Sequence, residues 1–139
     1  MSATSVAVVQ SLYDNFARGD IPAVLGVLAP SIEWIESPQE YLPHRGTHRT
    51  PGEVADKVFG MVMTSFDAFA VIAESVHDAG DVVVVEGRAT GLTKTGRTLD
   101  ARACWVWTVR DGKAVANHNY HDTDAWRLVL HDSAAHGPS

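Results

Sequence analysis

The chain has 139 residues, about the length of one domain, and its 45% hydrophobic and 20% charged residues are ordinary for a globular protein. A net charge of -6 with scattered Lys and Arg argues against nucleic-acid binding, which needs a basic face. The single cysteine excludes an internal disulfide, and without a signal-peptide pattern or a bilayer-length apolar run we expect a cytoplasmic protein with no membrane partner.

The N-terminal part of the chain predicts two helices followed by a strand. Apolar side chains recur at helical spacing over residues 5–18, and Gly19 is a suitable stop. Asp20 is a candidate cap for a second, shorter helix that Pro30 ends. Residues 32–36 are short, apolar and aromatic, and we expect a strand there.

A loop over residues 37–49 leads to a third helix with a clear start signal. Thr50, Pro51 and Glu53 match a capping box with proline at the first helical position, which satisfies backbone amides that otherwise lack partners. The buried stripe of this helix is predicted to contain Val54, Val58, Met61 and Val62.

From Phe69 onward the apolar period changes to two. This predicts strands at about 69–77, 81–92, 98–110 and 114–122, joined by short glycine-containing turns. Such short turns require antiparallel pairing in a meander. A last short helix, capped by Asp122 or Thr123, runs to Leu130. Helices followed by an antiparallel sheet indicate an α+β domain, ordered over about 5–131 of residues 1–139, with the small, polar ends unstructured.

Four stretches, in order along the chain, resemble a known superfamily. They are Tyr13-Asp14-Asn15-Phe16 with Gly19-Asp20, Pro43-His44-Arg45-Gly46-Thr47-His48, Trp107-Thr108-Val109-Arg110-Asp111-Gly112-Lys113, and Tyr120-His121-Asp122-Thr123. The set resembles SnoaL-like and ketosteroid isomerase-related proteins of the nuclear transport factor two-like superfamily. The resemblance implies a cone-shaped curved antiparallel sheet packed on N-terminal helices, a cystatin-like α+β barrel with a deep apolar cavity. It also implies a homodimer formed through the outer sheet face.

The last strand supplies the main catalytic candidates. Period two places His118, Tyr120 and Asp122 on one face; Asn117, Asn119 and His121 are on the other. If the first face looks into the cavity, desolvation makes Asp122 a better base, while His118 or Tyr120 can donate to an oxyanion. SnoaL-like cyclases use an Asp near the end of this strand as general base, and Asp122 is the matching position. The alternative is that Asp122 only caps the final helix.

Metal and cofactor binding are not expected. His118 and His121 are three residues apart on a strand, which directs their rings to opposite faces. No glycine-rich phosphate-binding loop joins a strand to a helix. Cys104 lies in an apolar strand pattern and is expected to be an unreactive small hydrophobe.

Glu36 is a second candidate catalytic acid or base and shares a strand face with Trp34. In ketosteroid isomerase the carboxylate base lies near the end of this strand, just before a proline. Here Ser37 precedes Pro38, so the match is out by one residue, and a one-residue shift reverses a side chain on a strand. Steroid isomerisation is therefore not favoured. Glu36 is either a base in the cavity or a surface carboxylate at the strand end.

Aromatic residues are expected to line the ligand site. Trp105 and Trp107 share a strand face and either fill the core or give the pocket flat walls suited to a polycyclic molecule. His44 is either at the pocket mouth or a solvated loop residue. The expected ligand-binding set is Trp34, Trp105, Trp107, His44 and Phe16.

The sequence thus predicts a cofactor-independent acid–base enzyme of isomerase, cyclase or hydrolase type that acts on a small hydrophobic metabolite. A non-catalytic binding or sensing module would use the same pocket without turnover. A third alternative is a structural dimer whose own side chains fill the interior.

Overall fold

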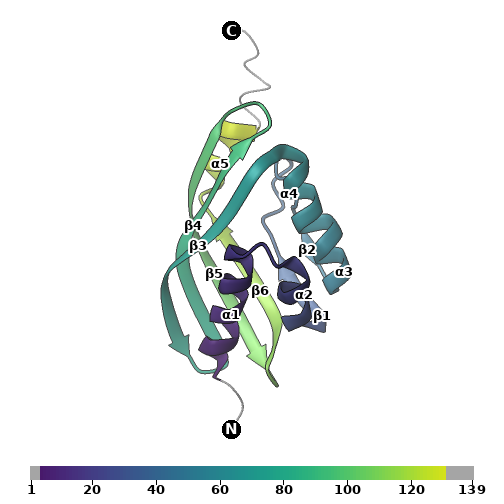
Figure 1. Ribbon diagram of the computed structural model, residues 1–139, viewed down its shortest axis with the longest axis vertical. Coiled ribbons are helices and arrows are strands. Elements are labelled where there is room, and N and C mark those ends of the chain that lie inside the picture. The colour runs from purple at the N-terminus through teal and green to yellow at the C-terminus, as the bar shows by residue number, and fades with distance from the viewer. Residues whose placement is uncertain (1–3, 131–139) are drawn as a thin grey trace.

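Helices cover one face of a curved, six-stranded sheet in the computed structural model, which describes residues 4–130 (Figure 1). The strand order is β2-β1-β6-β5-β4-β3, so β2 and β3 are the edges of an unclosed sheet. The expected α+β class is confirmed. The predicted unstructured C-terminal segment, 132–139, and residues 1–3 at the other end lie outside the described residues.

The two N-terminal helices form where capping residues and apolar spacing predict them. The first, α1 (Ser5–Ala17), begins at Thr4, whose side chain accepts a hydrogen bond from the Ala7 amide. The second, α2 (Ile21–Val27), begins at Asp20, which caps the Ala23 amide at 3.1 Å. It ends three residues before Pro30, because β1 (Leu28–Ile35) begins immediately after it.

The strand β1 has two different neighbours. It pairs antiparallel with the short β2 (Thr47–His48), Trp34 lying opposite His48. On its other side it pairs parallel with β6 (Lys113–His121), although the sequence predicted only antiparallel pairing. The parallel pair brings the end of β1 beside the end of β6, as Figure 1 shows.

The third helix contains a wide turn. It comprises α3 (Pro51–Glu53), the π-helical η1 (Val54–Phe59) and α4 (Gly60–Ser65), and the predicted Thr50 cap is confirmed by a 3.0 Å bond from the Glu53 amide. In η1 the Gly60 amide reaches the Ala55 carbonyl, five residues back. The predicted stripe is correct for Val54, Val58 and Val62. It is wrong for Met61, which is 39% exposed, because the extra residue in the turn rotates it away from the core.

The predicted meander is confirmed. Its strands are β3 (Phe66–Ala79), β4 (Val82–Thr93), β5 (Thr98–Arg110) and β6, and all neighbouring pairs are antiparallel. A Cβ atom at Gly87 would lie 1.8 Å from the Ile72 carbonyl oxygen, so glycine allows the close approach of β3 to β4 there. The helix α5 (Thr123–Leu130) follows β6 and buries Trp126 completely.

A β-bulge near the start of β6 decides which of its side chains face the helices. Val109 pairs with Ala114 but Thr108 pairs with Ala116, so Val115 has no partner on β5. Beyond this extra residue, the inner-face pairs are Trp107 with Asn117, Trp105 with Asn119, and Ala103 with His121. A regular hairpin would instead have placed His118 opposite Trp105, because one inserted residue reverses every later side chain.

No helix within residues 4–130 is both long enough and apolar enough to cross a membrane.

Candidate functional site

A cavity of ≈ 330 Å³ lies between the helices and the inner face of the sheet. This volume is within the range of about 300–1,000 Å³ that is usual for small-molecule sites. Aromatic rings dominate its wall: Tyr13, Phe16, Trp34, Phe59, Phe69, Trp105 and Trp107. A molecule bound here would therefore contact mainly flat, apolar surfaces.

The aromatic wall is fixed by contacts among the rings themselves. Trp34 packs edge-on against Trp107 with 5.6 Å between ring centroids, and against Phe59 with 5.7 Å. Trp107 Nε1 donates a 3.0 Å hydrogen bond to the Tyr13 hydroxyl. All five predicted ligand-binding side chains lie in this wall: Trp34, Trp105, Trp107, His44 and Phe16.

The Tyr13 hydroxyl is a polar group in this otherwise apolar part of the cavity. Burial raises the pKa of Tyr13 far above its usual value, more than its bond with Trp107 lowers it, so the phenol stays protonated. Its oxygen accepts from Trp107, and within residues 4–130 its own proton has no acceptor. The hydroxyl can therefore donate to a ligand.

Two buried amide side chains of β6, Asn117 and Asn119, form a polar strip in the wall of the cavity. Asn117 lies between Trp34 of β1 and Trp107 of β5 in the strand register. The Asn119 side chain donates a 3.0 Å bond to the Ile35 carbonyl, which fixes its orientation. The Asn117 Oδ1 atom is buried and has no hydrogen-bond partner in the described part of the chain. It is an acceptor available to a ligand hydroxyl or amine.

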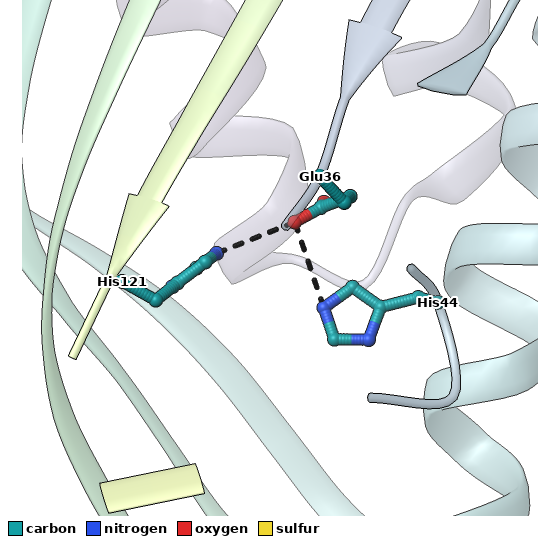
Figure 2. A group of neighbouring side chains, drawn as sticks. All are labelled: Glu36, His44 and His121. Carbon is teal, nitrogen blue, oxygen red and sulfur yellow. Dashed lines mark ion pairs between the residues drawn. The ribbon is translucent and has the colours of Figure 1, made fainter. Parts of the chain in front are cut away.

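Glu36, His44 and His121 meet at one end of this strip (Figure 2). Glu36 Oε1 lies 3.7 Å from His44 Nε2 and 3.5 Å from His121 Nε2, and the three side chains are only 3%, 3% and 5% exposed. Figure 2 shows both imidazoles directed at the carboxylate, one from the loop after β1 and the other from the end of β6. Glu36 and His44 also line the cavity.

Neighbouring bonds hold this trio in place. Trp34 Nε1 donates a 2.7 Å bond to Glu36 Oε2, which leaves Oε1 directed at the imidazoles. The Glu36 amide donates to the Gly46 carbonyl at 2.9 Å, so the loop folds back over the strand end. His48 Nε2 bonds to the His44 carbonyl at 3.0 Å and fixes the backbone that carries His44.

Burial and mutual charge set the protonation of the trio. Burial opposes ionisation of Glu36, but the nearby His121 and His44 and the Trp34 hydrogen bond together lower its pKa below the usual range. Burial also lowers the pKa of His44, and this outweighs the opposite influence of Glu36. At neutral pH the site therefore contains a Glu36 carboxylate beside a neutral His44 imidazole.

The predicted inward orientation of His118, Tyr120 and Asp122 is wrong. His118 and Tyr120 lie on the outer face, where Tyr120 is 50% exposed and its hydroxyl lies 3.1 Å from His118 Nδ1. Asp122 is exposed and accepts a 3.2 Å bond from the Ala125 amide, so the capping alternative is correct for this residue. The physical reason is the bulge at Val115, which exchanges the two faces of β6.

Two open alternatives are settled by geometry. Glu36 is not a surface carboxylate, since it lies on the buried face with Trp34, and His44 is not a solvated loop residue. His118 and His121 do point to opposite faces, as predicted. Sequence reasoning missed the trio because His121 is far along the chain from Glu36 and His44. Tyr13 was named there only within the first family-like stretch, although a buried phenol usually finds a polar partner.

The comparisons with known proteins agree with this architecture. Residues 9–117 match the family model of the SnoaL-like domain. A crystal structure of an NTF2-like protein from Burkholderia thailandensis E264 is 31% identical, covers 92% of this chain and 98% of that one, and superposes with a TM-score of 0.85. No curated protein matches the chain significantly.

Two further structures share the fold at lower identity. TerC, co-crystallised with polyporic acid, is 24% identical, covers 91% of this chain and 98% of its own, and has a TM-score of 0.83. A proposed SnoaL-like polyketide cyclase from Jannaschia sp. CCS1 is 22% identical, covers 91% and 90% of the two chains, and has a TM-score of 0.72.

Proposed function

The chain belongs to the SnoaL-like family, and we propose that it is a cofactor-independent acid–base enzyme acting on a small, ring-containing, largely apolar molecule. The observation that carries this proposal is the position of Glu36, a buried carboxylate in the wall of an aromatic cavity. Its lowered pKa keeps this carboxylate ionised at neutral pH, so it is available to accept a proton from a carbon acid held in the cavity.

Each polar group has a distinct role in this proposal. Glu36 takes a proton from the carbon next to a carbonyl group of the bound molecule, and the electron pair moves onto the carbonyl oxygen. The protonated Tyr13 hydroxyl donates to that developing oxyanion. The neutral His44 imidazole, 3.7 Å from Glu36, can receive the proton and return it. Return of the proton to another carbon gives isomerisation, and attack of the enolate on a second carbonyl gives cyclisation.

The wall favours a bicyclic or polycyclic substrate. The cavity volume of ≈ 330 Å³ and the facing indole rings suit two or three fused rings better than an extended chain. Polyporic acid is the molecule in the TerC structure, and because TerC shares this fold, polyporic acid is a suitable binding probe for the present protein. The unpartnered Asn117 Oδ1 supports a substrate that also carries a hydroxyl group.

The experiment uses 2-tetralone, a bicyclic ketone with acidic hydrogens beside its carbonyl. Binding of 2-tetralone and of polyporic acid is followed by quenching of tryptophan fluorescence, since three indoles line the cavity. Exchange of the tetralone hydrogens in D₂O is followed by mass spectrometry. We expect Glu36→Gln to keep binding but to lose about 10²–10⁴-fold in exchange rate. The Asp122→Asn control, on the outer surface, should exchange at the wild-type rate.

Unchanged exchange in Glu36→Gln would remove Glu36 as the base. Tight binding without exchange in the wild type would instead favour the second candidate function, a ligand-binding or sensing module. That candidate is supported by the same preformed cavity and requires no chemistry from the trio.

The expected homodimer through the outer sheet face remains a proposal. It is supported by exposed apolar side chains on that face, Ile72 and Leu92, which are each 42% exposed. Light scattering with Leu92→Lys as the interface variant would test it, since a monomeric wild type excludes the dimer.

A further inference from the structure

Three side chains of types that commonly bind metal ions converge away from bulk solvent in this protein. The donor atoms of Glu36, His44 and His121 lie within 4.8 Å of one another. The two measured separations from Glu36 Oε1, 3.7 Å and 3.5 Å, are longer than direct N–H···O hydrogen bonds, which are usually about 2.7–3.2 Å. The trio is therefore close together without being closed by strong mutual bonds.

From this geometry we propose that Glu36, His44 and His121 form a binding site for a divalent transition-metal ion of the Zn²⁺ or Co²⁺ type. We further propose, resting on the function above, that the bound ion inhibits the enzyme by occupying the Glu36 carboxylate.

The spacing of the donors fits such an ion. Zinc lies about 2.0–2.2 Å from nitrogen and oxygen ligands, so two ligands in a tetrahedral site are roughly 3.3–3.6 Å apart. The separations of 3.5 Å and 3.7 Å are close to this value. The widest pair of the trio is at most 4.8 Å apart, so one imidazole would have to move inward by up to about 1.2–1.5 Å for all three to bind at this distance.

The donor set is also one that zinc uses. Two imidazoles and one carboxylate are the protein ligands of a recurrent class of open zinc site, which keeps a fourth position for water or another small ligand. Glu36 and His44 line the cavity, so the fourth position of the ion would face the cavity.

An independent observation points to a bound cation. Glu36 Oε1 is buried and has no hydrogen-bond partner within residues 4–130, whereas Oε2 is held by Trp34 Nε1. A buried carboxylate oxygen without a partner is costly, and a cation at this point would satisfy it. The Trp34 bond would orient the carboxylate toward the ion, as outer hydrogen bonds do in metal sites.

The Nδ1 atoms of the two imidazoles, which point away from Glu36, affect the expected affinity for the ion. His44 Nδ1 and His121 Nδ1 are buried and have no acceptor in the described part of the chain. Loss of such outer hydrogen bonds costs metal sites about 10–100-fold in affinity, so we expect Zn²⁺ to bind more weakly here than at a site whose imidazoles have these bonds.

The outer surface provides a matched control. His77 Nε2 lies 2.8 Å from Glu86 Oε1, but these side chains are 56% and 60% exposed, and among residues 4–130 no third donor completes the pair. A His–Glu pair at the surface should therefore not bind the ion at comparable affinity.

The experiment titrates chelator-treated protein with Co²⁺, followed by visible absorption, and with Zn²⁺, followed by calorimetry. We expect one ion per chain, with affinity lowered roughly 10-fold or more in His121→Gln and in Glu36→Gln and unchanged in His77→Gln. Circular dichroism verifies that each variant is folded. Equal binding by wild type and both trio variants, or no binding by the wild type, would overturn the site.

Exchange of 2-tetralone in chelator and in Zn²⁺ separates this inference from the proposed function. If the wild type exchanges in chelator, and zinc suppresses this exchange more in the wild type than in His121→Gln, both the metal site and the proposed function are supported. Exchange in chelator without metal binding overturns the metal site alone. Metal binding without exchange in either condition supports the site and overturns the acid–base function. Exchange only with zinc also supports the site, but overturns the cofactor-independent chemistry and the inhibition.

Discussion

The two faces of β6 carry similar side chains in opposite environments. On the outer face, His118 and Tyr120 stack with ring centroids 4.4 Å apart and bond to each other at the surface. On the inner face, Asn117, Asn119 and His121 are enclosed by indole rings and a buried carboxylate. The contrast teaches that burial, more than residue type, gives a histidine or an amide chemical significance here. One unpaired residue, Val115, determines which side chains of β6 lie on the buried face.

Deletion of Val115 should have the largest effect, because it would restore a regular hairpin and exchange the two faces. Asn117, Asn119 and His121 would then leave the cavity while His118 and Tyr120 entered the core. We expect a loss exceeding about 4–5 kcal/mol in the free energy of unfolding, a large part of the roughly 5–15 kcal/mol that stabilises a typical domain. Urea unfolding measures it, with Val115→Ala as the control that keeps the bulge. A deletion variant with wild-type stability and ligand binding would contradict the role of the bulge.

The next comparison sets an inner amide against an outer hydroxyl. Asn119→Ala removes the donor to the partly buried Ile35 carbonyl and should lower the free energy of unfolding by about 1–3 kcal/mol. Tyr120→Phe removes only the exposed bond to His118 and should change it by less than about 0.5 kcal/mol. Equal effects in chemical denaturation would show that the two faces are energetically alike.

Acid should destabilise the fold through His44 and Glu36. The folded-state pKa of His44 is below its unfolded value, so the unfolded state binds more protons and stability falls as the pH drops below about 6.5. The pKa of Glu36 is also lowered, so its contribution is present above its unfolded pKa and is lost as the pH falls through the folded one.

The contribution of His44 is at most about 1.4 kcal/mol per pH unit. Between pH 7 and 5, His44→Gln should therefore show a flatter dependence of the urea midpoint on pH than the wild type. The surface variant His77→Gln should keep the wild-type slope. Parallel curves for all three proteins would exclude His44 as an acid-sensitive group.

Local signals in the sequence predicted most of the fold. The Thr50 capping box, the Asp20 cap and the glycine turns act within a few residues, and the elements begin and end near the predicted positions. Period two likewise placed Trp105 and Trp107 together on one strand face, and this face lines the cavity. These features depend on neighbours in sequence, which is why pattern reasoning can find them.

The site itself was predicted only in part, because it depends on contacts between distant segments. The bulge at Val115 and the wide turn of η1 each insert one residue, and such insertions are set by packing of the sheet against the helices. Glu36 and His44 were candidates, but nothing local indicates that His121 lies beside them. The parallel pairing of β1 with β6 brings them together.

Asp122 gives the smallest and most discriminating test, because it should affect stability without affecting the site. Its side chain caps α5 through the Ala125 amide, so Asp122→Ala should lower the free energy of unfolding by about 1 kcal/mol. Asp122→Asn should keep most of that stability, since Asn caps helices nearly as well as Asp. Exchange of 2-tetralone should be unchanged in both variants, because Asp122 is exposed and the proposed base is Glu36. A large loss of exchange in folded Asp122→Asn would instead make this outer carboxylate part of the chemistry, and the inner and outer faces could no longer be assigned separate functions.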